Sequence, residues 1–238
     1  MITHLSQQVD LKKVSLPDYH SESFAEGIYR VFREAILSLD FKPGEIIRKR
    51  PICQKFGVSR TPVADAMLRL ESESLVEIIP QSITRVAKLS LRSIHDESFL
   101  REALEVAAVA YAAKHRTQEQ VDNLISNLRS QKLFAESKDL NAFYQLDEKF
   151  HLIILECCQV SNLPATLEKL STQVRRARLL LLPNPSRINN TVNEHEAIVK
   201  AIQMGNPDSA TSAMRSHLQQ LIKHLEPLEK QRPELFNV

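Results

Sequence analysis

Four side chains in the second half of the sequence are of the types that bind divalent metal ions. Asp147 and His151 are four residues apart, so on one helix they project from the same face. His195 and His217 follow in two further apolar stretches with helical spacing, which place both histidines on inward faces. Imidazole and carboxylate groups on inward faces of three helices predict a divalent metal site. Each histidine taken alone is better explained as a core residue satisfied by hydrogen bonds.

Arg101 is a second candidate for chemistry. It opens the motif Arg101-Glu102-Ala103-Leu104-Glu105, in a stretch that is apolar from residue 104 to residue 113. An arginine at the core end of such a helix can bind a carboxylate through two parallel hydrogen bonds. Helix geometry supports equally a surface arginine paired with Glu105 one turn later.

The segment 56–63 predicts a sharp turn between two helices. Gly57 permits the turn, Ser59 is a favourable N-cap, and Pro62 suits a first helical turn. Apolar residues then repeat at helical spacing as far as Leu70. Such a helix-turn-helix presents the first residues of its second helix to DNA bases. An ordinary helical hairpin in a core has the same local spacing.

Positive charge is concentrated at this turn. Five basic residues and no acidic one lie in the segment 48–60, although the formal net charge of the whole chain is only +2. The five are Arg48, Lys49, Arg50, Lys55 and Arg60. A focused basic patch neutralises phosphates and releases their counterions, which supplies non-specific affinity for DNA. A charge run is usually a solvated face, but its coincidence with the turn favours DNA binding.

The elements around the turn predict a winged helix. Residues 1–20 are polar without a clear period, and we expect a flexible N-terminal arm there. The segment 21–39 has one apolar face and predicts a helix. Two short β-rich runs at 75–79 and 83–89 predict a hairpin after the helix-turn-helix. We therefore place a winged helix-turn-helix domain at 21–89.

The rest of the chain predicts a second, all-helical domain at 93–228. Its sequence is nearly continuous amphipathic helix with short breaks, one of them at Pro183-Asn184-Pro185. The expected helices are 93–115, 117–136, 139–159, 162–182, 187–204 and 207–225. Short connections between helices predict an antiparallel bundle. The expected fold class is thus mostly α, a winged helix-turn-helix followed by a helical bundle.

Composition excludes several classes of protein. The chain has 238 residues, enough for two domains, and its 43% hydrophobic and 25% charged residues are ordinary for a globular protein. No apolar run approaches the roughly 20 residues of a membrane span, and no secretory signal is expected. Three cysteines form no disulfide framework and suit a reducing cytoplasm. Four glycines leave no phosphate-binding loop, which argues against nucleotide enzymes.

In their order and separation these motifs resemble the GntR family of bacterial transcription factors, in its FadR-type branch with an all-helical FCD effector domain. The resemblance runs from about residue 23 to about residue 225. In the first domain it rests on Lys42-Pro43-Gly44-Glu45, Phe56-Gly57-Val58-Ser59-Arg60-Thr61-Pro62-Val63 and Leu70-Glu71. In the second domain it rests on Arg101-x-x-Leu104-Glu105, Asp147-x-x-Phe150-His151, Glu194-His195-x-x-Ile198 and Met214-x-x-His217-Leu218.

For the first domain the resemblance implies binding to double-stranded DNA. A homodimer would bind a short palindromic operator, with the recognition helix in the major groove and the wing nearby. The residues that would contact DNA by position are Arg50, Ser59, Arg60 and Thr61. Arg48 and Lys49 belong to the basic patch that we expect at the phosphates.

For the second domain the resemblance implies metal and effector binding, together with dimerisation. A metal, zinc or nickel in many relatives, would help to bind a small carboxylate effector. Its ligands would be Asp147, His151, His195 and His217. Arg101 would face the effector pocket.

Two positions depart from the family pattern. Ala64 stands where the family usually has an arginine, one turn after Arg60, and a methyl group cannot bond a guanine. The wing lacks its usual glycine near the tip. We expect Arg60 to carry more of the base readout, and Gln81 or Arg85 to replace the contacts of the wing.

The sequence therefore predicts a ligand-responsive, DNA-binding regulator, a repressor in the cytoplasm with no membrane partner and no enzymatic activity. One alternative is a metal-dependent hydrolase or isomerase on a helical bundle, because three histidines and a carboxylate can activate water. That alternative has no second carboxylate as general base and leaves the winged helix unexplained. A metal-free bundle used only for dimerisation is the other alternative.

Overall fold

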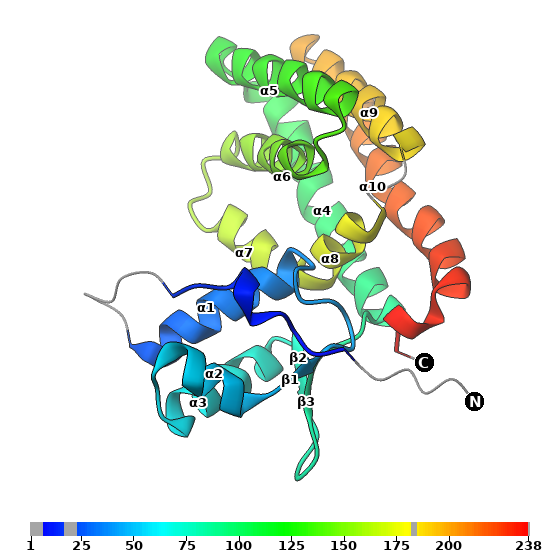
Figure 1. Ribbon diagram of the computed structural model, residues 1–238. Helices are drawn as coiled ribbons and strands as arrows, with labels where there is room; N and C mark the ends of the chain where they lie inside the picture. The colour runs from blue at the N-terminus through cyan, green and yellow to red at the C-terminus, as the bar shows by residue number, and fades with distance from the viewer. Residues whose placement is uncertain (1–6, 17–22, 182–184, 238) are drawn as a thin grey trace. The chain divides into compact units, whose positions relative to one another are not determined.

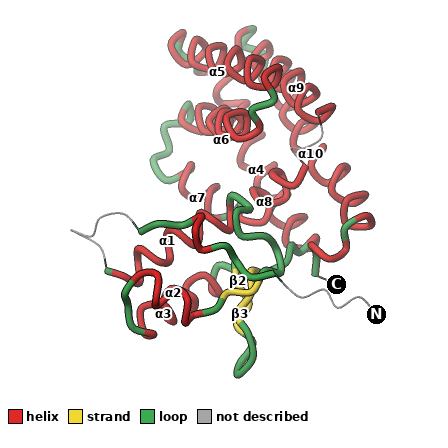
Figure 2. The backbone as a smooth tube through the Cα atoms, viewed as in Figure 1, coloured by secondary structure: helices red, strands yellow, loops and turns green. Residues whose placement is uncertain are grey.

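A computed structural model describes residues 7–16, 23–181 and 185–237. The chain forms two compact units. The first comprises Met1–Ser90 and Arg232–Val238, and the second comprises Leu91–Gln231. The first unit holds three α-helices and a small sheet, and the regular secondary structure of the second is entirely helical among its described residues (Figures 1 and 2). The predicted fold class, a winged helix-turn-helix followed by a helical domain, is confirmed. In the described part of the chain, no helix is long and apolar enough to cross a membrane.

The first unit has the element order of a winged helix. Its helices are α1 (Phe24–Leu37), α2 (Lys49–Phe56) and α3 (Arg60–Ser72). Its strands are β1 (Ile46–Ile47), β2 (Val76–Ile78) and β3 (Thr84–Val86). The sheet is antiparallel with the order β1-β3-β2, and Figure 2 shows its strands in yellow. The predicted hairpin is β2 and β3, while the two-residue β1 is too short for a sequence pattern to predict.

Local sequence explains the helix boundaries of this unit. The Ser23 hydroxyl accepts a hydrogen bond from the Glu26 amide and caps α1. Gly57 ends α2 with φ at +64°, a left-handed conformation that glycine adopts without strain. Residues Val63, Ala66, Met67 and Leu70 of α3 are buried in the core of the unit, as their helical spacing predicts.

Part of the predicted N-terminal arm belongs to this core. Val9 and Val14 are buried, and the Val9 amide donates to the Ile46 carbonyl at 3.1 Å. A short 3₁₀ helix, Leu11–Lys13, lies between the two valines. The expectation of a flexible arm is therefore wrong for residues 7–16. The apolar residues of this segment alternate irregularly with polar ones and carry no readable period; they are Val9, Leu11, Val14 and Leu16. Residues 1–6 and 17–22 lie outside the described residues.

The second unit contains seven helices among its described residues. They are α4 (Leu91–His115), α5 (Gln118–Ser137), α6 (Leu140–Glu156), α7 (Leu163–Lys169), α8 (Thr172–Leu181), α9 (Pro185–Gln203) and α10 (Pro207–Gln231). α4 packs along α10, and α5 packs against α6 and α9 (Figure 1). These contacts bring α6, α9 and α10, which carry the predicted metal ligands, around one core.

One predicted helix, 162–182, is two helices. The first helix, α7, ends at Lys169, and a second helix, α8, begins at Thr172. The Glu97 carboxylate of α4 accepts hydrogen bonds from the amides of Gln173 and Val174 at 2.9 and 3.0 Å. A capping side chain from another helix stabilises the N-terminus of α8, which the local sequence does not predict. Of the predicted break at 183–185, residues 182–184 lie outside the described residues.

The C-terminal segment rejoins the first unit. After α10, the Leu89 amide donates to the Leu235 carbonyl at 3.0 Å, and the Asn237 amide donates to the Leu89 carbonyl at 2.8 Å. Phe236 is only 2% exposed. The predicted domains ended at residue 228 and gave this segment no role.

Candidate metal and DNA-binding sites

The three predicted histidines converge in the core of the helical unit. His151 comes from α6, His195 from α9 and His217 from α10, and all three are buried. The Nε2 atom of His217 lies 3.3 Å from Nε2 of His151 and 3.4 Å from Nε2 of His195. Each ring can offer one nitrogen to a common point, with these atoms within 4.8 Å of one another.

The opposite nitrogen of each ring has its own acceptor. Nδ1 of His151 donates to the Glu105 carboxylate at 2.5 Å, and Nδ1 of His217 donates to Glu194 at 2.6 Å. Nδ1 of His195 lies 2.8 Å from Oε1 of Gln131. Carboxylate and amide oxygens only accept, so the proton of each neutral ring is on Nδ1. Three Nε2 lone pairs therefore face one another.

This donor set fits a divalent metal ion. Lone pairs at such distances repel one another unless a cation lies between them. A metal that binds imidazole nitrogens at about 2.0–2.1 Å in tetrahedral geometry holds them about 3.3 Å apart. The fourth predicted ligand, Asp147, is buried, and its Oδ1 atom lies 3.5 Å from Nε2 of His195. Its other oxygen forms an ion pair with Arg178.

The electrostatics of the site favour an uncharged His195, an uncharged His217 and a charged Glu105. Burial, together with the neighbouring histidines, lowers the pKa of His195 and of His217 well below the usual value. Burial would raise the pKa of Glu105, but Arg101 and His151 outweigh it and lower that pKa. Neutral imidazole is the form that binds metals, so His195 and His217 need no proton loss before they can bind an ion.

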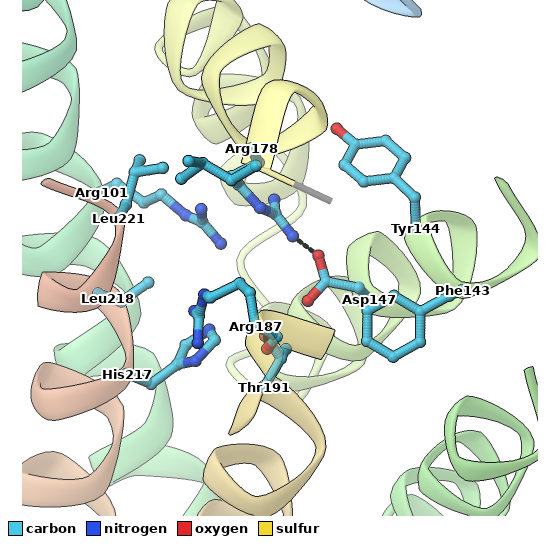
Figure 3. Close-up of a pocket in the computed structure, with 11 residues that line it drawn as sticks. Arg101, Phe143, Tyr144, Asp147, Arg178, Arg187, Thr191, His217, Leu218 and Leu221 are labelled. Carbon is cyan, nitrogen blue, oxygen red and sulfur yellow. Dashed lines mark hydrogen bonds and ion pairs between the residues drawn. The ribbon is translucent and has the colours of Figure 1, made fainter. Parts of the chain in front are cut away.

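Arg101 is buried, with 6% exposure, and also pairs with Glu105 at 2.5 Å. The expected i, i+4 pair exists, but the interpretation of Arg101 as a surface residue is wrong. Together with His217 and Asp147 it lines a pocket beside the histidines (Figure 3). The other residues of this pocket are Phe143, Tyr144, Arg178, Leu181, Arg187, Thr191, Leu218 and Leu221.

The sequence did not single out two of the three arginines of the pocket. Arg178 of α8 pairs with Asp147 and Glu148, and burial lowers its pKa to about 10, as does Arg101. Arg187 of α9 pairs with Glu194 at 2.8 Å. No local motif marks either arginine, because the pocket forms between helices that are distant in sequence.

The residues that accept hydrogen bonds from the histidines differ in whether the sequence could have predicted them. Glu105 and Glu194 stand inside the motifs that contain Arg101 and His195, so adjacency to a motif was an available signal. Gln131 lies on α5, 64 residues before His195, and has no such signal.

The predicted DNA contacts are exposed at one end of the helix-turn-helix. Ser59 is the N-cap residue of α3 but its side chain makes no capping hydrogen bond, and Arg60 and Thr61 follow at the start of the helix. Arg48 and Arg50 are exposed and Lys49 is partly exposed at the start of α2. Among the described residues, none of these basic side chains forms a salt bridge.

The wing presents its two predicted residues differently. Gln81 is exposed at the hairpin tip with φ at +57°, so it holds the left-handed conformation that glycine usually fills. Arg85 on β3 pairs across the sheet with Glu77 on β2 at 2.6 Å. Gln81 is thus the freer of the two to reach a ligand.

Two family descriptions match the chain. Residues 24–86 match "Bacterial regulatory proteins, gntR family", and residues 98–220 match "FCD domain".

Characterised relatives cover most of the chain. The HTH-type transcriptional repressor RspR of Escherichia coli is 30% identical over 210 residues, covering 88% of this chain and 92% of its own. The Uxu operon regulator of Haemophilus influenzae is 33% identical over 190 residues, covering 72% of this chain and 70% of its own. These relatives are regulators of transcription, which removes the hydrolase or isomerase alternative.

Solved structures share the fold. E. coli McbR/YncC has a TM-score of 0.72 at 20% identity, covering 87% of this chain and 99% of its own. A GntR regulator from Rhodococcus has a TM-score of 0.73 at 17% identity, with the same coverage of both chains.

Proposed function

Because the chain belongs to the GntR family of bacterial regulators and carries an FCD domain, we propose that it is a metal-dependent repressor controlled by a small carboxylate. That it is a DNA-binding transcriptional regulator and not an enzyme follows from the family. The repressor assignment is supported by RspR, whose name states that activity. The convergence of three Nε2 atoms carries the metal part of the proposal.

The winged helix would bind a palindromic operator in the cytoplasm. Arg60 and Thr61 at the exposed start of α3 would read base edges in the major groove. Arg48, Lys49 and Arg50 would contact phosphates, with Ser59 at the entrance of the recognition helix and Gln81 or Arg85 in the wing. Ala64 leaves this helix with one basic side chain at its start.

His151, His195, His217 and Asp147 would hold the metal, zinc or nickel. When bound, the ion offers open coordination positions to a carboxylate. Glu105, Glu194 and Gln131 orient the three rings through their Nδ1 protons, so the ring planes are fixed before the ion arrives.

The pocket beside the histidines supports a carboxylate effector. Arg101 is placed to bind its acid group in a buried setting, where an ion pair is strong. Among the described residues the Tyr144 hydroxyl is buried without a hydrogen-bond partner, and it lines the same pocket. A buried polar group without a partner is costly, so the effector would carry a further oxygen for this hydroxyl.

A homodimer is supported by the outer face of α4. Phe99 is 74% exposed, and Leu100 and Tyr111 are also exposed on this helix. Together with the exposed Ala103 and Ala107, they form an apolar stripe at helical spacing. We call these five residues the α4 stripe.

The α4 stripe is complementary to a second copy of itself. An antiparallel pair of α4 helices, with its twofold axis at the level of Glu105, places Phe99 opposite Tyr111 and Ala103 opposite Ala107. The same pairing places exposed Asp96 opposite exposed Lys114. A twofold interface requires this self-complementarity, which supports a second copy as the partner.

Purified full-length protein tests the proposal directly. Elemental analysis should find about one divalent ion per chain, and His151→Ala should lose it. Operator binding should change when a small carboxylate is added to wild-type protein and remain unchanged in Arg101→Ala. Protein without metal in any preparation would support the metal-free dimerisation bundle instead.

A further inference from the structure

The Asp147 carboxylate faces two different groups. Its Oδ1 atom points to the histidine cluster, 3.5 Å from Nε2 of His195. Its Oδ2 atom forms an ion pair with Arg178, which reaches across from α8 (Figure 3). Arg178 also contacts Glu148, the next residue of α6. The carboxylate therefore stands between a cation that the chain supplies and the point where the Nε2 atoms converge.

Arg178 occupies the pocket in this arrangement. Its guanidinium carbon lies 5.4 Å from the centre of the Tyr144 ring, and its side chain is largely buried. The free volume left in the pocket is about 40 Å³. That space holds a few water molecules and leaves little room for an organic acid beside Arg178.

The charges of the pocket also oppose an anion. Its three guanidinium groups are paired with four carboxylates, so with neutral histidines the site has a formal charge of −1. The pairs are Arg101 with Glu105, Arg178 with Asp147 and Glu148, and Arg187 with Glu194. With a divalent ion among the histidines, the formal charge becomes +1.

We propose that Arg178 and the metal ion compete for Asp147, and that Arg178, when released, becomes with Arg101 the clamp for the effector carboxylate. This inference rests on the proposed metal and carboxylate sites. It makes Arg178 a positioning residue that prevents effector binding in the metal-free protein. The effector would then bind only after the ion, because Arg178 otherwise keeps its place over Asp147.

Zinc affinity of the full-length protein tests the competition without knowledge of the effector. Isothermal titration of metal-free protein with Zn²⁺ should give about tenfold tighter binding in Arg178→Gln than in wild type, within the range of coupling between charges in contact. Arg215→Gln is the charge-matched control, since Arg215 pairs with Glu102 and does not line the pocket. Circular dichroism and thermal unfolding verify that each variant is folded.

The double variant identifies Asp147 as the shared partner. In an Asp147→Asn background, Arg178→Gln should leave the zinc affinity unchanged, because the competition is already absent. Equal or weaker zinc binding in Arg178→Gln alone would overturn the inference and assign Arg178 to support of the metal ligand. An equal gain in Arg215→Gln would also overturn it, since the effect would then be a general charge effect.

The outcomes separate this inference from the proposed function. If neither wild type nor Arg178→Gln binds zinc, the metal site itself fails and the inference fails with it. If Arg178→Gln binds zinc and wild type does not, the competition is supported in its strongest form. If both bind zinc equally, the metal site stands and only the role of Arg178 is refuted.

Discussion

At the scale of single residues, the histidines of this chain have different roles according to the groups that contact their two ring nitrogens. The ring of His115 stacks near Tyr111, and Nδ1 of His224 donates to a backbone carbonyl within its own helix. His151, by contrast, has a carboxylate behind Nδ1 and two other imidazoles in front of Nε2. A metal site therefore depends on paired environments rather than on the histidine itself.

Gln131 provides a test of this dependence. Gln131→Met keeps the length of the side chain but removes the oxygen that accepts from Nδ1 of His195. Loss of such a supporting acceptor lowers metal affinity by about 10- to 100-fold. Titration with Zn²⁺ measures this loss. Gln118→Met on the exposed start of α5 is the control and should bind zinc as wild type does.

We expect base readout to depend on Arg60. Arg60→Ala should remove the preference for the operator over random DNA, because Ala64 offers no second guanine contact in the same helix. Zinc binding in the helical unit should remain. Competition binding assays at fixed salt measure the preference, and Arg129→Ala on exposed α5 is the charge-matched control. An unchanged operator preference in Arg60→Ala would show that other residues make the base contacts.

These residues also show what a sequence can reveal about a site. Asp147 and His151 were predictable because four residues on a helix return to the same face. Arg178 and Gln131 were not, because they reach the site from helices whose packing is a tertiary property. The sequence predicts which residues of one helix share a face, but it does not predict which residues of different helices come together.

At the scale of elements, α4 is apolar on two faces. One face packs along α10 and buries Val109 and Ala112, while the α4 stripe remains exposed. A contiguous exposed apolar patch on an otherwise charged surface helix is typical of an interaction site. The exposed α4 stripe is the surface through which we propose that the chain dimerises.

Charge reversal tests the antiparallel pairing. Asp96→Lys should weaken the dimer, because it sets two lysines opposite each other at Lys114. The double variant Asp96→Lys with Lys114→Asp should restore it. Sedimentation velocity measures the dimer fraction, with Asp122→Lys on exposed α5 as control. A dimer that is indifferent to both variants would place the interface on another surface.

The cap of α8 by Glu97 gives a pH dependence with a defined sign. Burial raises the pKa of Glu97, and the amides of Val174 and Gln173 offset this rise only in part. The folded protein therefore holds the proton more tightly than the unfolded chain, whose glutamate has a pKa near the ordinary 4.5. This contribution to stability is complete below the unfolded pKa and is lost as the pH rises through the folded pKa.

Glu97→Gln removes that titration while keeping an acceptor for the helix amides. The melting temperature of wild type, relative to Glu97→Gln, should fall as the pH rises above 4.5. Thermal unfolding at a series of pH values measures the difference. A difference between the two proteins that is constant with pH would mean that Glu97 has the same pKa in both states.

At the scale of the whole molecule, the chain passes between its two units twice. It leaves the winged helix between Ser90 and Leu91, and it returns between Gln231 and Arg232. The first passage was expected from the change in sequence texture after the wing. The second was not, because one aromatic residue in a short polar segment carries no pattern. α10, which contains His217, is thereby joined directly to the segment that pairs with Leu89.

This second connection joins α10, which carries His217 of the proposed metal site, to the C-terminal segment of the winged-helix unit. Phe236→Ala should destabilise the winged-helix unit by about 3 kcal/mol, the cost of emptying a buried aromatic site. Zinc affinity should be unchanged, since the histidines lie in the other unit, but the effect of zinc on operator binding should shrink. Differential scanning calorimetry and operator titrations with and without Zn²⁺ measure these effects. Glu234→Ala on the exposed part of the segment is the control, and a full zinc response in Phe236→Ala would leave Ser90–Leu91 as the sole route of coupling.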